Sequence, residues 1–154
     1  MIANRPLLLA AALVTAMVAG PFVAEAQSQD FKKPERLICV SELSSGFAWK
    51  NDGWRQTTFN VDDEKFIVQP SRSGTPHEIE VLKIGKATPE YTCHFFVLDD
   101  FISNRATCGG IGMGMLVDFK TLRFTSVYTP GFVDGAENND NTPNITIGKC
   151  TPLN

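Results

Sequence analysis

The four cysteines of this chain constrain its fold more than any other feature of the 154-residue sequence. They are Cys39, Cys93, Cys108 and Cys150, and all of them follow a segment that is typical of a secretory signal peptide. That segment has one basic residue, an apolar run over residues 7–23 and a small-x-small cleavage site at residues 24–26. We therefore expect residues 1–26 to be removed and the chain to be secreted or periplasmic.

A membrane anchor is the alternative interpretation of residues 7–23, because the run is close to the spanning length of about 20 residues. The Gly20-Pro21 pair inside the run and the cleavage site after it favour removal. No stable membrane span is expected after cleavage.

An even number of cysteines in an oxidising compartment indicates two disulfides. Of the three possible pairings, we favour Cys93 with Cys108, which closes a local loop, and Cys39 with Cys150, which joins the two ends of the domain. In the chain-entropy model, a loop of about 16 residues stabilises the fold by about 3 kcal/mol and a loop of about 110 residues by nearly 5 kcal/mol. Zinc is the competing use of four cysteines, but the sequence contains no C-x-x-C pair.

The part of the chain that follows the leader is expected to form one domain. Residues 27–35 are a polar lead-in, and residues 36–154 are enough to bury a core. The formal net charge is −3, and it stays so without the leader, which holds one arginine and one glutamate. Because the charges are scattered and mildly acidic, we expect no nucleic-acid partner.

Short runs rich in β-branched and aromatic residues alternate with turn residues along residues 36–154, and no helical periodicity is sustained. The expected strands cover residues 36–42, a hairpin over 46–60, and then 65–69, 78–84, 91–97, 104–109, 111–119, 122–128 and 144–150. This pattern predicts an all-β domain, either a small antiparallel barrel of about eight strands or a compact sandwich.

The hairpin over residues 46–60 carries both tryptophans. A two-residue turn at Asp52-Gly53 would place Lys50 opposite Arg55, and like charges directly opposite each other are unfavourable. A three-residue loop over residues 51–53, with Gly53 in the left-handed conformation, avoids that pairing. We therefore expect Phe47, Trp49 and Phe59 to face inward and Trp54 to face outward. Core and rim packing is the favoured role for both tryptophans, and a binding role is the alternative.

The glycine-rich stretch TCGGIGMGM, residues 107–115, matches neither a Walker loop nor a dinucleotide-binding loop, and no helix follows it. Its alternation instead predicts a strand with one apolar face, made of Ile111, Met113, Met115, Val117 and Phe119, and a bare glycine face. A turn at residues 120–121 would place Val117 opposite Phe124 and Met113 opposite Tyr128. A neighbouring segment of the same chain is the expected occupant of the bare face.

Metal and catalytic chemistry have few candidate residues. Met113 and Met115, with His77 or His94, could bind copper, but core packing is the preferred role of this methionine pair. Carboxylates in the polar connection 129–143 could bind calcium, but they lack the EF-hand spacing. The sequence has no nucleophile elbow and only two histidines. We therefore expect no metal, no cofactor and no enzymatic activity.

Surface recognition is the role that remains, and three segments are candidates for it. They are the turn over residues 70–76, the connection 129–143 with Phe132 in it, and the outward-facing Trp54. We expect a non-catalytic binding module whose partner is a protein or a glycan. An envelope enzyme with an unrecognised site is the alternative from another functional class.

A family likeness is carried by four segments, which are Cys39-Val40-Ser41-Glu42 leading to Gly46-Phe47-Ala48, residues 54–59, residues 122–128, and above all the ending over residues 142–150. In these segments the chain resembles a family of small, uncharacterised, exported proteobacterial β-proteins. This resemblance implies export and a β-rich fold, and it implies no activity.

A second resemblance, carried by Ser71-Arg72-Ser73-Gly74 and Lys86, is to the bacterial inhibitors of c-type lysozyme. That family implies an exported, disulfide-bonded, eight-stranded β-barrel. It also implies a role for Ser71, Ser73 and Lys86 in entering the cleft of the enzyme. This chain departs from the family pattern, because Gly85 precedes Lys86 instead of following it and the tryptophan before the lysine is missing.

Overall fold

The computed structural model describes residues 35–98, 101–135 and 137–153, so the predicted leader and nearly all of the lead-in lie outside the described residues. The described residues form nine strands and one short helix. The strands are β1 (Leu37–Trp49), β2 (Trp54–Phe59), β3 (Lys65–Pro70), β4 (Glu78–Lys83), β5 (Tyr91–Leu98), β6 (Phe101–Gly110), β7 (Met113–Asp118), β8 (Arg123–Tyr128) and β9 (Asn144–Pro152), and the helix is α1 (Pro130–Val133). The predicted all-β class is confirmed.

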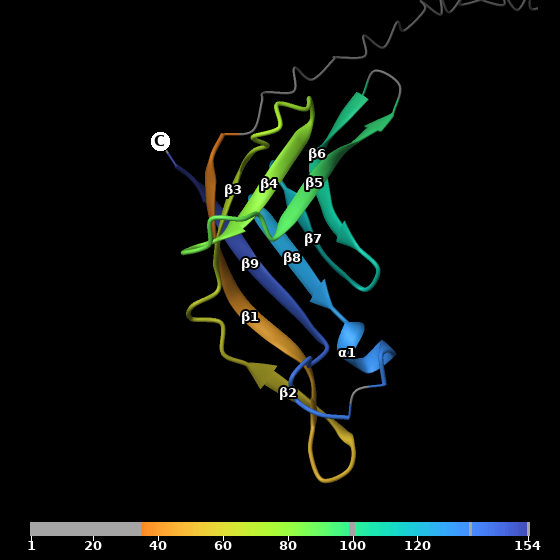
Figure 1. Cartoon of the computed structure of the whole chain (residues 1–154). Helices are drawn as coiled ribbons and strands as arrows, with labels where there is room; N and C mark the ends of the chain where they lie inside the picture. Colours follow the sequence, from red (N-terminus) through yellow and green to blue (C-terminus); the bar gives the residue numbers. More distant parts are fainter. Residues whose placement is uncertain (1–34, 99–100, 136, 154) are drawn as a thin grey trace, which may run out of the picture.

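Eight of these strands close an antiparallel barrel. The strand order is β2-β1-β3-β4-β5-β6-β7-β8-β9, and β9 pairs back onto β1 along residues 37–46. The ninth strand, β2, pairs with β1 outside the closed ring. Figure 1 shows the β1–β2 hairpin extending from one end of the barrel, at the end where α1 also lies. The barrel alternative is therefore confirmed over the sandwich.

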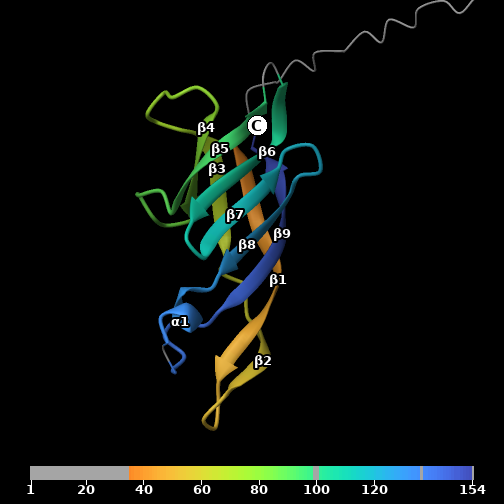
Figure 2. The same cartoon turned by 90° about the vertical axis from the view of Figure 1, so that its right-hand side faces the viewer.

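Strand β1 can serve both the barrel and the hairpin because it changes partner along its length. Its first residues, 37–40, pair with β3, and residues 44–49 pair with β2. A bulge between Ser41 and Leu43, seen in the register with β9, reverses the alternation. Cys39 and Ser41 face inward before the bulge, and Ser44 and Ala48 are buried after it. Figure 2 shows β1 continuing past the barrel into the hairpin.

The core fills the interior of the barrel with aliphatic, aromatic and cysteine side chains. Two ring pairs lie in this interior. Phe66 and Phe124 pack edge to face, and Phe95 packs against Phe119 at a tilt. The buried cluster consists of Leu37, Cys39, Phe66, Val68, Ile79, Val81, Cys93, Phe95, Ala106, Cys108, Met115, Val117, Phe124 and Cys150. Burial of this apolar surface is the main term that stabilises the domain.

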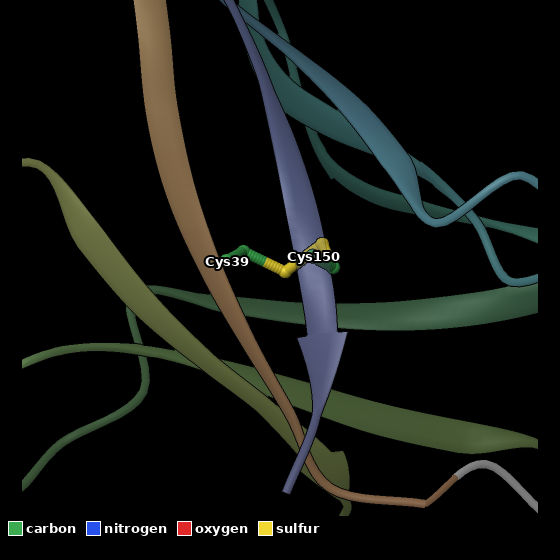
Figure 3. The surroundings of a disulfide bond; sticks show 2 residues. All are labelled: Cys39 and Cys150. Atoms are coloured by element: carbon green, nitrogen blue, oxygen red, sulfur yellow. A yellow bond between two sulfur atoms is a disulfide. The ribbon is translucent and has the colours of Figure 1, made fainter.

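Both predicted disulfides are present. Cys39 is bonded to Cys150 across the β1–β9 seam, and Cys93 is bonded to Cys108 across β5 and β6. Each pair is directly opposite in its ladder, and the four side chains are buried. Figure 3 shows the Cys39–Cys150 bond joining the first barrel strand to the last. The end-to-end closure is therefore confirmed.

The register predicted for the tryptophan hairpin is wrong. The turn is Asn51-Asp52, with φ of 49° and 63°, and Lys50 exchanges two backbone hydrogen bonds with Gly53. These left-handed angles belong to a type I′ turn, which Asn and Asp tolerate. Trp49 therefore lies opposite Trp54, on the same face. The bulge in β1 also turns Phe47 outward, where 51% of it is exposed.

The glycine-rich stretch is only in part the strand that was predicted. Ile111-Gly112 is a turn between β6 and β7, so Ile111 is fully exposed and not packed inward. Met115 and Val117 are buried, as predicted, whereas 39% of Met113 is exposed. The predicted pairs Val117 with Phe124 and Met113 with Tyr128 are confirmed.

The bare backbone of this stretch is covered by the chain itself. Thr129 donates both its N–H and its hydroxyl to the carbonyl of Gly112. At Gly114, an added Cβ would overlap the backbone carbonyl of Cys108 on the neighbouring strand. A neighbouring segment of the same chain therefore lies against Gly112 and Gly114, as predicted, whereas no atom lies within 4 Å of a Cβ added at Gly110.

Candidate binding surface

An aromatic cluster joins the β1–β2 hairpin to α1. The Trp49 and Trp54 rings are edge to face, with centroids 5.6 Å apart, as expected for directly opposed residues of an antiparallel pair. The Trp54 ring also meets Phe132 of α1 at 6.0 Å. Phe132 keeps 61% of its surface exposed. The hairpin and the helix therefore present one continuous aromatic surface.

The connection 129–143 is held in place along the edge of β1. The Asn139 side chain accepts a hydrogen bond from the Trp49 N–H at 2.7 Å and donates one to the Trp49 carbonyl at 2.9 Å. It thereby substitutes for a strand partner at this position. The Phe47 N–H donates to the Pro143 carbonyl at 2.9 Å. The position of α1 is thus set by hydrogen bonds to the hairpin that it packs against.

An apolar hollow of about 310 Å³ lies on the outer face between the hairpin and β8. Its lining residues are Ser45, Gly46, Phe47, Gln56, Val127, Thr129, Pro143, Asn144 and Ile145. The ladders explain why the apolar residues meet, since Ile145 lies opposite both Ser45 and Val127. This volume lies at the lower end of the range of about 300–1,000 Å³ for ligand pockets.

The apolar surface continues beyond the hollow along β1 and β9. Leu43 lies opposite Ile147, and these two side chains are 66% and 46% exposed. We use the name "apolar outer face" for Leu43, Phe47, Trp54, Val127, Phe132, Ile145 and Ile147. The outer face of a small barrel usually carries polar residues, so a contiguous apolar group marks a contact surface.

The structure brings two of the predicted binding residues, Trp54 and Phe132, into this surface. The sequence did not predict a binding role for Leu43, Val127, Ile145 and Ile147, and Phe47 was expected to face inward. One signal could have located the isoleucines. Because Cys150 faces inward in a disulfide, the alternation of β9 places the odd-numbered residues, Ile145 and Ile147, outside.

The other predicted binding residues lie in the connections on either side of β4. Ser71 and Ser73 belong to the β3–β4 connection, and both hydroxyls donate to Oε1 of Glu78, at 2.7 and 3.0 Å. Lys86 lies in the β4–β5 connection. Arg72 links the two connections, because its guanidinium pairs with Glu80 at 2.9 Å and donates to the Ala87 carbonyl at 3.3 Å.

A histidine, a carboxylate and two hydroxyls therefore lie close together near the start of β4. The hydroxyls of Ser71 and Ser73 are the main cause of the lowered pKa of Glu78, and the charge of His94, opposite Glu78 in the ladder, lowers it further. In a hydrolytic triad the imidazole stands between the hydroxyl and the carboxylate. Here the Glu78 carboxylate itself accepts the hydrogen bonds of the two serine hydroxyls, with no imidazole between them. A carboxylate whose pKa is lowered is also a weak general base.

Among residues 35–98, 101–135 and 137–153, no three side chains of His, Cys, Asp or Glu are grouped as metal ligands would be. No helix within that part of the chain has the length and apolar character to cross a membrane.

Comparison of the chain with protein families, curated proteins and solved structures finds no match.

Proposed function

We propose that this chain is a secreted or periplasmic binding module that recognises a protein partner through the apolar outer face. The observation that carries the proposal is the group of half-exposed apolar side chains around the hollow. Phe47 is 51% exposed and Ile145 is 55% exposed. Two disulfides support a role in an oxidising compartment.

The face has the composition of a recognition surface. Tryptophan is enriched among the residues that dominate binding energy, because its large, rigid ring loses little conformational entropy when it is buried, and phenylalanine is enriched at interfaces. The Trp54 ring is already held by Trp49 and Phe132. A partner would therefore meet a preorganised aromatic surface, which lowers the entropic cost of binding.

The test is capture of a partner from periplasmic or culture extract by the immobilised, oxidised chain from residue 27 onward. A Phe47→Ser/Ile145→Ser variant removes apolar contact without touching the core. The control, Phe101→Ser, replaces a phenylalanine of similar exposure, 57%, on β6. We expect one protein to be retained by the wild type and the control and to be lost with the double variant.

Retention of the same protein by all three forms contradicts the proposed face. Capture of a polysaccharide without any protein favours the glycan alternative. Trp54→Ala removes the central ring of the cluster and should weaken capture at least tenfold. Truncating an aromatic ring at the centre of an interface typically costs roughly 2 kcal/mol or more of binding free energy.

A second candidate is inhibition of c-type lysozyme, by similarity to that inhibitor family. It is supported by the closed eight-stranded barrel and by the exposed Ser73-Gly74 segment of the β3–β4 connection. A lytic assay tests it, with the wild type protecting the cell-wall substrate and Lys86→Ala protecting it less. Absence of protection at a large molar excess of this chain would end the hypothesis.

A further inference from the structure

A second hollow, with a different chemistry, lies where β1 begins and β9 ends. It has a volume of about 340 Å³ and is lined by Arg36, Ile67, Gln69, Leu82, Lys83, Ile84, Gly85, Lys86 and Leu153. Figure 1 shows this end of β1 and β9 far from α1 and the hairpin. The second hollow, which we name the cationic groove, is therefore separate from the apolar outer face.

The floor of the cationic groove is apolar. Ile67 of β3 and Leu82 of β4 are directly opposite in the ladder, and both are half-buried. Ile84 extends this floor beyond the end of β4, and 51% of it is exposed. Leu153, after β9, adds a further half-exposed apolar side chain. An exposed aliphatic strip of this kind favours an occupant with an alkyl chain.

The lining also carries positive charge that no salt bridge among the described residues neutralises. Arg36, Lys83 and Lys86 contribute three cations, and no acidic residue is among the lining residues. Within the described part of the chain, none of the three forms a salt bridge. Since the whole chain has a net charge of −3, this local excess of cations is not a consequence of composition.

Arg36 is held over the groove by a relay of polar contacts. Its Nε donates to the Gln69 side-chain oxygen at 3.1 Å. The Gln69 amide nitrogen donates in turn to the carboxylate of Glu80, which is buried. Arg72 neutralises that carboxylate. The buried Glu80 thereby fixes Gln69, and Gln69 orients the guanidinium of Arg36, as preorganised binding requires.

We propose that the cationic groove binds a single-chain carboxylate amphiphile, with its head at Arg36 and Lys86 and its chain along Ile67, Leu82 and Ile84. The positive charge favours an anionic head group, and the apolar floor favours an alkyl chain. A guanidinium and an ammonium suit a carboxylate, which accepts charge-assisted hydrogen bonds from both. This proposal does not depend on the protein partner proposed above.

Calorimetric titration with decanoate, below its micelle concentration, tests the proposal on the oxidised chain from residue 27 onward. We expect saturable binding at one site, with octanoate binding about tenfold more weakly because two methylene groups are lost. Acetate supplies the charge alone, and decyl maltoside supplies the chain alone. Both should bind at least tenfold more weakly than decanoate.

Substitutions assign the binding to the groove. Arg36→Gln/Lys86→Gln should weaken decanoate binding about tenfold, and raising the salt from 0.05 to 0.5 M should weaken it in the wild type but little in this variant. Ile84→Ser should weaken decanoate binding and leave acetate binding unchanged. Lys120→Gln, an exposed lysine of the β7–β8 connection, is the matched control. All three variants change exposed side chains, and unchanged thermal unfolding would confirm their fold.

Four results would overturn the proposal. Three of them are the absence of saturable binding, equal affinity for decanoate and decyl maltoside, and undiminished binding by both groove variants. Tight binding of acetate, equal to that of decanoate, would also overturn it, because the site would then be an anion site without a chain.

Discussion

Gly148 shows how one missing side chain permits the barrel to close. It lies opposite Ser41 on one neighbouring strand and Phe124 on the other. An added Cβ would overlap the Val40 carbonyl oxygen and the Phe124 ring. We expect Gly148→Ala to lower the free energy of unfolding by about 1–3 kcal/mol, because overpacking must displace backbone or ring. Urea unfolding followed by fluorescence measures it.

Gly110→Ala is the matched control for that change. No atom lies within 4 Å of a Cβ added at Gly110, and its φ is not in the left-handed region. The free energy of unfolding should then change by less than about 0.5 kcal/mol. Equal effects of the two alanines would mean that the close approach at Gly148 is relieved without cost.

We expect Asp118 to make the free energy of unfolding depend on pH. Burial alone would raise its pKa, but hydrogen bonds from Arg105 and from the backbone of Thr121 and Lys120 lower it from 3.8 to about 2. Because the folded-state pKa is depressed, the stabilisation is complete above pH 3.8 and is lost as the pH falls toward about 2. With allowance for solvent screening, its size is about 1 kcal/mol.

Asp118→Asn tests this contribution through the pH dependence of unfolding. The free energy of unfolding should fall less steeply between pH 4 and pH 2 in the variant than in the wild type, by roughly 1 kcal/mol over the window. Arg105→Gln should reduce the slope by a smaller amount, since the backbone donors remain. An unchanged slope in Asp118→Asn would contradict the assignment.

At the scale of elements, the connection 129–143 depends on Asn139 more than on its own short helix. The Asn139 amide satisfies both backbone groups of Trp49. Asn139→Ala should leave these groups without their partner and release α1 from the hairpin, at a cost of about 1–3 kcal/mol locally. Amide hydrogen exchange at Trp49 should accelerate at least fivefold.

Glu137→Ala, in the same connection and exposed, is the control for the asparagine. It should leave the exchange rate at Trp49 unchanged. If Asn139→Ala also left this rate unchanged, the amide bridge would not be what holds the connection against β1.

Strand positions were predictable where alternation was strong, and so was the register of β7 with β8. The register of the tryptophan hairpin was not. The strands from β3 to β9 lie close to their predicted ranges because turn residues separate their apolar runs. The predicted register of the tryptophan hairpin was wrong because both alternatives, the favoured loop over residues 51–53 and the Asp52-Gly53 turn, placed Gly53 inside the turn. The turn here is Asn51-Asp52. The prediction that Ile111 packs inward was also wrong. A β-branched residue rarely adopts a positive φ, so nothing in the sequence indicated that Ile111, with a φ of 47°, lies in a turn.

The candidate surface was harder to predict than the strands. Nothing in the local sequence of β1 indicates the bulge between Ser41 and Leu43, and one extra residue there transfers Phe47 from the inner to the outer face. Trp54 and Phe132 were identified as candidates separately. Their contact depends on Asn139, which binds a strand 90 residues away in the sequence. Such pairing across the fold has no local signature.

At the scale of the whole molecule, the seam between β1 and β9 decides whether the sheet is a barrel. It unites strands from opposite ends of the domain, and the Cys39–Cys150 bond crosses it with a sequence separation of 111. The other disulfide, Cys93–Cys108, has a separation of 15 and lies within one hairpin. The strand pattern left the barrel and the sandwich both open, whereas the predicted Cys39–Cys150 pairing joined the two ends of the domain.

The two disulfides should consequently contribute unequally to stability. Cys39→Ala/Cys150→Ala should lower the free energy of unfolding by about 5 kcal/mol, and Cys93→Ala/Cys108→Ala by about 3 kcal/mol, because the longer loop restricts the unfolded chain more. The seam variant should also speed amide exchange along β9, since only that bond ties β9 covalently to β1. The hairpin variant should leave β9 protected. A larger loss in the hairpin variant would mean that closure rests on the β1–β9 hydrogen bonds and packing more than on the covalent tie.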